Sequence, residues 1–221
     1  LQTISFLTSV AKKETKILIL APSSLIYNWK QEFSKFAPQM EVAVVYGLKQ
    51  HRDELIATNP QVVITSYASF RQDVEEYQKN QYEYLILDEA QVMKNAQTKI
   101  AQHLRGFEVP HIFALSGTPI ENHVGELWSI FQIVLPGLFP AKKEFQKLSP
   151  ETIARFVKPF VLRRKKNEVL QELPDLIETT YHNELDESQK TIYLAQLKQI
   201  QDRVRTSSEE ELNRSKVEIL S

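Results

Sequence analysis

Two adjacent carboxylates, Asp88 and Glu89, have the types and the spacing needed for chemistry on a phosphate. They directly follow the apolar run 84–87, which predicts a strand buried on both faces of a sheet. Open α/β sheets place their ligand sites at the carboxyl ends of strands, where this pair would lie. In a phosphoryl-transfer site, one carboxylate holds Mg²⁺, directly or through water, and the other orients or deprotonates the attacking water. The alternative interpretation is a solvated acidic turn, because such pairs are common on protein surfaces.

A second polar segment, formed by Ser116, Gly117, Thr118 and Pro119, follows the apolar run 111–115. Glycine permits a tight backbone turn, and the two hydroxyls can relay hydrogen bonds. The alternative is a plain connection between a strand and a helix, in which the proline starts the helix.

The elements that must position these residues alternate along the chain. Five apolar runs predict strands, and the segments between them predict helices, up to about residue 135. Such alternation predicts βαβ units and an α/β fold, a parallel sheet with helices on both faces. The five runs are 17–21, 42–46, 62–65, 84–87 and 111–115.

The segment after the first run predicts a helix that carries a tryptophan. Ser23 or Ser24 is expected to cap this helix at its start. Trp29 stands at helical spacing with Phe33 and Phe36, so we expect it to lie in the core rather than to stack on a base.

Composition excludes several other kinds of site. The 221 residues contain no cysteine, which excludes disulfides and thiolate metal sites, and the five histidines have no metal-motif spacing. The formal net charge of −1 means that any nucleic-acid site must be a local patch. No apolar run approaches the roughly 18 residues of a membrane span, and no signal peptide opens the chain. We therefore expect an intracellular protein, in the cytoplasm, the nucleoid or a nucleus, without a membrane partner.

The character of the chain changes after residue 140. Strand-like runs stop, and charged segments with helical spacing follow. Residues 141–172 contain nine basic and four acidic residues, a net charge of +5. We therefore predict an α/β domain over residues 1–140 and a mostly helical, basic subdomain over residues 141–221.

Several segments occur in an order that is typical of one family. They resemble motifs Ia, Ib, II and III of the Swi/Snf-type remodelling ATPases of helicase superfamily two, and the segment that follows this family's first lobe. The resemblance spans nearly the whole chain and implies a RecA-like first lobe, then a protrusion and a linker toward a second lobe. The segments are Leu20–Trp29, Ile64–Tyr67, Asp88–Asn95, Leu115–Asn122, Glu126–Ser129, Pro159–Arg164 and Glu172–Pro174.

The resemblance implies a motor that hydrolyses ATP with Mg²⁺ and moves on double-stranded DNA. It implies that Asp88 is the Mg²⁺-associated carboxylate and that Glu89 activates water. Gln91 stands where the family most often has His, and the resemblance places it beside the nucleotide, where it would couple nucleotide state to the second lobe. The Ser-Gly-Thr segment resembles motif III, which links hydrolysis to DNA contact.

The expected DNA contacts come from loops at strand ends and from basic residues. Hydroxyls and backbone N–H groups hold phosphates without reading sequence. Lys94 and Asn95 match the family's extension of motif II, and solvated turn residues are their alternative. Arg163 and Arg164 open a basic run that contacts phosphates, faces solvent, or pairs with acidic residues of the first lobe. The expected contacts are Ser23, Ser24, Thr65, Ser66, Tyr67, Lys94, Asn95, Arg163 and Arg164.

A motor of this family also needs a P-loop, G-x-x-x-x-G-K-[S/T], whose N–H groups and Lys hold the phosphates. No glycine of this chain precedes a lysine, so these residues contain no P-loop. Residues 1–4 resemble the helix that follows the P-loop, so we expect the chain to begin just after that loop. The second lobe and its arginine finger are also missing, so we expect this chain alone not to hydrolyse ATP, although its parent should.

The strand that precedes the P-loop is central in RecA-like sheets. Without it, we expect neighbouring strands with unpaired backbone groups and a missing core layer. The sheet would be rearranged, completed by another chain, or marginally stable. The strands around Leu85 and Ala114 would then form no unbroken ladder within one chain.

Two other functions remain open at this stage. One is a passive domain that docks on DNA or on protein, and the other is a strand-separating helicase of superfamily two. Tyr27, Asn28 and Trp29 resemble the remodeller branch in particular. For a motor, the expected partners are double-stranded DNA, the second lobe of the same parent and a protein that is displaced from DNA.

Overall fold

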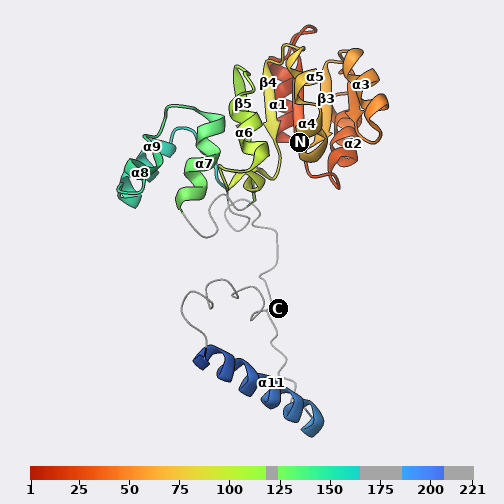
Figure 1. The fold of residues 1–221 in the computed structure, drawn as a ribbon. Coiled ribbons are helices and arrows are strands. Elements are labelled where there is room, and N and C mark those ends of the chain that lie inside the picture. The colour runs from red at the N-terminus through yellow and green to blue at the C-terminus, as the bar shows by residue number, and fades with distance from the viewer. Residues whose placement is uncertain (118–123, 165–185, 207–221) are drawn as a thin grey trace, which may run out of the picture. The chain divides into compact units, whose positions relative to one another are not determined.

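The computed structural model describes residues 1–117, 124–164 and 186–206 (Figure 1). The chain divides into two compact units, Leu1–Leu162 and Arg163–Ser221. The first unit holds a five-stranded sheet and its helices. The described part of the second unit is mainly the helix α11 (Glu187–Thr206). The domain boundary near residue 140 stays a prediction.

The sheet confirms the predicted α/β fold. All of its strands are parallel and lie in the order β2-β3-β1-β4-β5. Each of the five apolar runs forms one strand, with ends that differ from the predicted ones by at most one residue. The strands are β1 (Ile17–Ala21), β2 (Val42–Val45), β3 (Val62–Ser66), β4 (Tyr84–Leu87) and β5 (His111–Ala114).

The prediction of a gap beside β4 was wrong. Strands β4 and β5 pair along their whole length, with Leu85 opposite Ile112 and Leu87 opposite Ala114. The physical reason is that β1 occupies the centre of the sheet and pairs with both β3 and β4. Every residue of β1 is fully buried, and full burial of an Ile or Leu side chain contributes about 1.5–3 kcal/mol. The core layer is therefore built by β1.

Alternate residues of β1 serve the two faces of the sheet. Ile17 and Ile19 pack with α1 (Gln2–Val10) and α2 (Ile26–Phe36). Leu18 and Leu20 pack into the core of the opposite face. The helices of that face are α3 (Lys49–Ala57), α4 (Tyr67–Gln72), α5 (Val74–Gln78) and α6 (Lys99–Arg105). The sheet is thus covered on both faces, as predicted.

A third, smaller core follows the sheet. It joins α7 (Val124–Val134), α8 (Lys142–Phe145) and α9 (Pro150–Val157). Ser149 caps α9 by accepting the N–H of Thr152, and Pro150 follows at the first helical position. These short helices agree with the predicted helical character after residue 140. The buried residues of this core are Leu127, Phe131, Phe139, Phe145 and Ile153.

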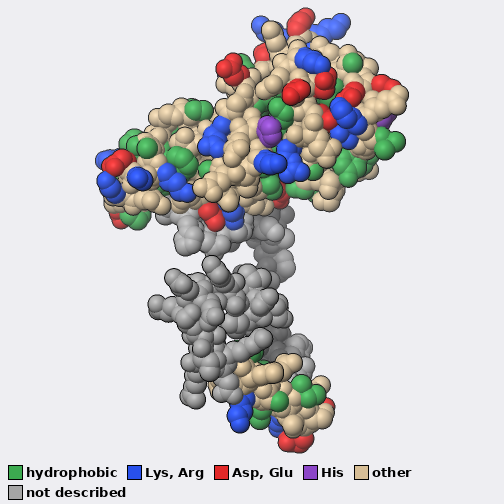
Figure 2. Space-filling view, in the orientation of Figure 1, with side chains coloured by type: hydrophobic (Ala, Val, Ile, Leu, Met, Phe, Trp, Pro, Cys, Tyr) green, Lys and Arg blue, Asp and Glu red, His purple; other side chains and the backbone are tan. Residues whose placement is uncertain are grey.

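Charge is mixed over the part of the chain that is described. Figure 2 shows Lys and Arg interspersed with Asp and Glu over the sheet, and several basic side chains over α8 and α9. Among the described helices, none has the length and apolar character required to cross a membrane. The basic side chains exposed on or beside α8 and α9 are Lys142, Lys143, Lys147, Arg155 and Lys158.

Candidate functional site

The carboxylate pair lies at the carboxyl end of β4, as predicted. The backbone N–H of Asp88 donates to the carbonyl of Leu20, at a distance of 2.8 Å, at the end of β1. The N–H of Ala90 donates to the carbonyl of Leu115, also at 2.8 Å, just after β5. The pair is therefore anchored to the strands on both sides of β4.

Both oxygens of the Asp88 carboxylate accept a hydrogen bond. Oδ1 accepts the backbone N–H of Glu89 at 3.0 Å, and Oδ2 accepts the indole N–H of Trp29 at 2.8 Å. A carboxylate oxygen can accept about two hydrogen bonds, so each oxygen retains capacity for a metal ion or a water. Asp88 is half-buried, which leaves this capacity accessible.

Trp29 was expected to be a core residue, and it does pack beside Phe33, with a ring-centroid distance of 6.3 Å. Its indole N–H, however, reaches a side chain 59 positions later in the sequence. Nothing in the spacing of Trp29 along α2 could indicate this contact. Neither Ser23 nor Ser24 caps α2, because the helix begins at Ile26 with Leu25 as its N-cap.

Glu89 has a left-handed backbone, with φ 50° and ψ 52°. A non-glycine residue in this region costs about 1–2 kcal/mol, and such residues are concentrated at functional sites. The turn directs the chain from β4 into the short 3₁₀ helix η1 (Ala90–Met93). Glu89 is half-buried and its Oε2 accepts an N–H of the Gln91 amide at 2.5 Å.

The Gln91 amide links two of the predicted motifs. Its other atom, Oε1, accepts the hydroxyl of Ser116 at 2.9 Å. The structure thus places Glu89, Gln91 and Ser116 in one hydrogen-bonded chain. Gly117 follows Ser116 and is exposed, whereas Thr118 lies outside the described residues.

Tyr67 also reaches the carboxylate pair. Its hydroxyl donates to the backbone carbonyl of Asp88 at 2.7 Å. Burial of the ring, and then the charges of Asp88 and Glu89, raise the pKa of Tyr67 above its usual value, so the hydroxyl keeps its proton. The tyrosine therefore acts inside the protein, as a brace between β3 and β4.

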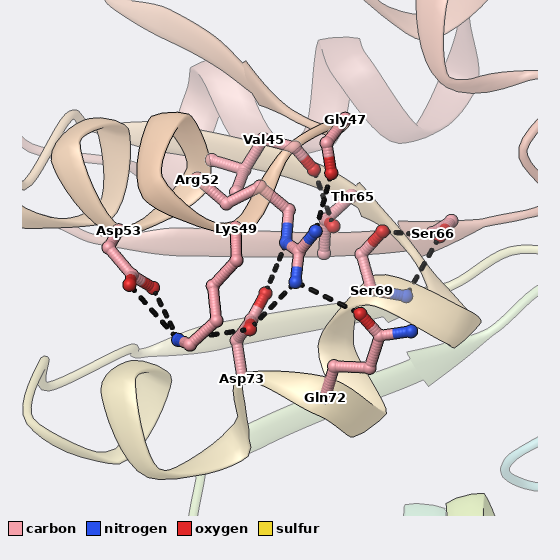
Figure 3. Close-up of polar contacts among 10 residues, drawn as sticks. All are labelled: Val45, Gly47, Lys49, Arg52, Asp53, Thr65, Ser66, Ser69, Gln72 and Asp73. Atoms are coloured by element: carbon pink, nitrogen blue, oxygen red, sulfur yellow. Dashed lines mark hydrogen bonds and ion pairs between the residues drawn. The ribbon is translucent and has the colours of Figure 1, made fainter.

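The polar residues before Tyr67 are also engaged inside the protein (Figure 3). Thr65 is fully buried and donates its hydroxyl to the carbonyl of Val45 at 2.7 Å. Ser66 caps α4 by accepting the N–H of Ser69 at 3.0 Å. Their predicted DNA contacts therefore depend on the backbone of this loop rather than on these two hydroxyls.

A hollow of about 550 Å³ opens where the loops after β1, β2 and β3 meet. Ser23 lines it and is exposed, as is the neighbouring Ser24. Gly47 and the exposed Ala68, at the start of α4, line other sides. The hollow brings together two of the segments that we expect to contact DNA, around Ser23 and around Tyr67.

A buried ion pair lies beside this hollow (Figure 3). Arg52 is 5% exposed and Asp73 is 2% exposed. The guanidinium donates two hydrogen bonds to the carboxylate, at 2.5 and 2.9 Å, and others to Gln72 and to the carbonyl of Gly47. The hydrogen bond with Asp73 raises the pKa of Arg52, which stays charged. The pair fastens α3 to the junction of α4 and α5.

The remaining predicted DNA residues belong to other segments of the chain. Lys94 Nζ lies 3.5 Å from an oxygen of Glu126, on α7. Asn95 accepts the N–H of Gln97 and forms the turn before α6. Arg163 and Arg164 are exposed and belong to the second unit, and the rest of their basic run, 165–166, lies outside the described residues.

The comparisons with known proteins decide the family. The profile of the SNF2-related domain matches residues 1–221, the whole chain. The chain belongs to this family. The resemblance to Swi/Snf-type ATPases and the RecA-like fold are thereby confirmed.

Named relatives of this SNF2-related domain are much longer proteins. The chain is 39% identical over 203 residues to an uncharacterized ATP-dependent helicase of Mycoplasma pneumoniae, and the match covers 84% of the chain and 20% of that protein. It is 34% identical over 214 residues to the TATA-binding protein-associated factor MOT1 of Saccharomyces cerevisiae, covering 84% and 11%. The chain therefore spans a fifth or less of these relatives.

A solved structure supports the same assignment. The Sulfolobus solfataricus SWI2/SNF2 ATPase core in complex with dsDNA matches this domain with a TM-score of 0.66 and 29% identity. The match covers 98% of this chain and 48% of that chain. The domain thus corresponds to about half of a SWI2/SNF2 ATPase core.

The residues present fit the kind of metal site that a nucleotide completes. Among the described residues, no group of three or more His, Cys, Asp or Glu could enclose a metal. Mg²⁺ in nucleotide sites is held by one or two carboxylates, with phosphates and water as the other ligands. Asp88, a half-buried carboxylate with capacity on both oxygens, meets this requirement.

Proposed function

We propose that this domain is part of an ATP-driven motor that moves on double-stranded DNA. It supplies the carboxylate that binds Mg²⁺, Asp88, and the base that activates water, Glu89. The observation that carries the proposal is the position of Asp88 and Glu89 at the end of β4. Their hydrogen bonds reach three other segments of the predicted motifs, at Trp29, Tyr67 and, through Gln91, Ser116.

Asp88 and Glu89 have different tasks in this proposal. Asp88 binds Mg²⁺, directly or through water, through its carboxylate oxygens. Two hydrogen bonds already fix the orientation of this carboxylate. When bound, Mg²⁺ neutralises charge that develops on the phosphate oxygens of ATP. Glu89 orients the attacking water and accepts its proton at a carboxylate oxygen.

Gln91 and Ser116 couple hydrolysis to DNA contact. The amide of Gln91 holds Glu89 with one atom and Ser116 with the other. A shift of the segment around Ser116, Gly117 and Thr118 would therefore move the carboxylate of Glu89. This direct hydrogen-bonded route supports the role that motif III has by resemblance.

Double-stranded DNA is the proposed substrate along which the motor moves. Exposed Ser23 and Ser24, and the start of α4, offer hydroxyls and backbone N–H groups to phosphates. Lys94, Asn95, Arg163 and Arg164 remain proposed contacts. The other proposed partners are a second RecA-like lobe of the same parent and a protein displaced from DNA, and this set of partners implies an intracellular setting.

The test is ATP hydrolysis by the full-length protein that carries this domain, with and without double-stranded DNA. We expect strong stimulation by DNA and its loss in Glu89→Gln. The matched control is Glu83→Gln, an exposed residue that precedes β4, and it should behave like the unchanged protein. DNA binding without hydrolysis would instead indicate a passive docking domain. The 221-residue chain alone should release no phosphate above its own Glu89→Gln variant, because it contains no Gly-Lys pair.

A further inference from the structure

We propose that Trp29 is a positioning residue for Asp88. Through this contact, Trp29 connects the loop before α2 to the carboxylate that is proposed to bind Mg²⁺. The inference rests on the proposed function, because it assigns Asp88 to Mg²⁺. It adds a residue outside the carboxylate pair whose N–H sets the orientation of that carboxylate. The indole N–H of Trp29 is 2.8 Å from Asp88 Oδ2.

The geometry at Asp88 makes this contact specific. Oδ1 is already bonded to the N–H of Glu89 at 3.0 Å, so the bond from Trp29 to Oδ2 fixes the second oxygen. Rotation of the carboxylate would break at least one of these bonds. An indole N–H is only a donor, and a hydrogen bond to an ionised carboxylate is about twice as strong as a neutral one.

Trp29 is itself held in place by the core. Its ring packs beside Phe33, which is fully buried, and it lies against the core cluster that α1 and α2 form on the sheet. It lies one turn into α2, whose first residue is Ile26. The loop 22–25, which carries two exposed serines, comes immediately before. A displacement of this loop would therefore be transmitted by a packed helix to Asp88.

Tyr67 provides a second connection of the same kind. Its hydroxyl donates to the backbone carbonyl of Asp88 at 2.7 Å, from the start of α4. Two of the segments that we expect to contact DNA are thus connected to Asp88, one through its side chain and one through its backbone. This convergence is a physical basis for DNA-dependent binding of the metal–nucleotide complex.

The first experiment measures the hydrogen bond itself in the 221-residue chain. The chain contains two tryptophans, so ¹H–¹⁵N spectra should show two indole resonances. Trp128 is an internal control, because its N–H donates to the carbonyl of Pro140 at 2.9 Å, away from Asp88. We expect Asp88→Ala to shift the Trp29 resonance and to accelerate its hydrogen exchange about tenfold or more, with Trp128 unchanged. Equal exchange of Trp29 with and without the Asp88 carboxylate would overturn the inference.

The second experiment tests the consequence in the full-length protein. It measures the affinity for a fluorescent ADP analogue with and without Mg²⁺, in the unchanged protein, Trp29→Phe and Trp128→Phe. Phenylalanine removes the N–H and keeps a smaller aromatic ring, and Trp128→Phe controls for the same loss of ring size. We expect the gain in affinity from Mg²⁺ to fall about tenfold in Trp29→Phe only, while affinity without Mg²⁺ stays the same. A Trp29→Phe protein that keeps the full Mg²⁺ gain would overturn the inference alone. An unchanged protein without any Mg²⁺ gain would overturn the proposed function as well.

Discussion

At the scale of single residues, substitutions of Glu89 can distinguish an effect on stability from an effect on function. The Glu89 φ of 50° lies in the left-handed region, where glycine adopts the conformation without steric cost. We therefore expect Glu89→Gly to be more stable than Glu89→Ala by about 1 kcal/mol, measured by urea denaturation of the chain.

In the full-length protein, we expect both variants to lose DNA-stimulated hydrolysis of ATP, because neither retains the carboxylate of Glu89. Glu83→Ala serves as a control for the loss of an acidic side chain near β4. Equal stability of the glycine and alanine variants would mean that the left-handed turn is not maintained in solution.

Single residues also mark the limit of sequence analysis. The positions of Asp88, Glu89 and Ser116 at strand ends were predictable, because these residues follow apolar runs that are easily recognised. The partners of these residues were not predictable, since Trp29 and Tyr67 reach Asp88 only after α2 and α4 are packed on the sheet. A hydrogen bond across 59 positions leaves no periodic pattern in a single sequence.

At the scale of elements, the ion pair of Arg52 and Asp73 fixes the helices beside the hollow. Removal of one partner of a buried pair leaves an uncompensated charge, which costs about 3–5 kcal/mol. We therefore expect Asp73→Asn to lower the free energy of unfolding of the chain by about 3 kcal/mol in urea denaturation.

The matched control is the pair of Lys147 and Glu144, whose side chains are 69% and 61% exposed. Lys147→Ala should change the free energy of unfolding by less than about 1 kcal/mol, because exposed ion pairs contribute little. If Asp73→Asn had an equally small effect, the pair would not be the fastener that joins α3 to α4 and α5.

The same pair explains a break between two helices. The structure has α4 and α5, which meet at Asp73. Asp73 is directed to Arg52, and its backbone leaves helical geometry with φ −119° and ψ 21°. A tertiary contact therefore decides the break, and local spacing cannot reveal it. The strands were predicted well because burial on both faces produces continuous apolar runs.

At the scale of the whole molecule, three tyrosines that are buried in the described part of the chain make the fold sensitive to alkali. Burial raises the pKa of Tyr82 to about 12, and burial also raises the pKa values of Tyr67 and Tyr77 above their usual range. An unfolded chain loses these protons near pH 10, where the folded chain still binds them. The unfolded state then binds fewer protons, so stability must fall as pH rises above about 10.

Urea midpoints of the chain between pH 8 and pH 11 would measure this loss. We expect Tyr82→Phe to make the decrease above about pH 10 less steep, because one of the three groups is removed. Tyr27→Phe is the control, since the side chain of Tyr27 is 57% exposed and should affect the slope less. Parallel curves for Tyr82→Phe and the unchanged chain would contradict this account.

The central position of β1 has a consequence for synthesis on the ribosome. Among the strands that the structure describes, the first partner of β1 to follow it in the chain is β3, which ends about 45 residues later. At roughly 5–20 residues per second, β1 is synthesised several seconds before it can pair with β3. During this interval, Ile17–Ala21 is a fully apolar segment that is not yet paired with β3, and such segments are prone to aggregation. The strand that stabilises the finished sheet is therefore also a segment that needs protection while the protein is being made.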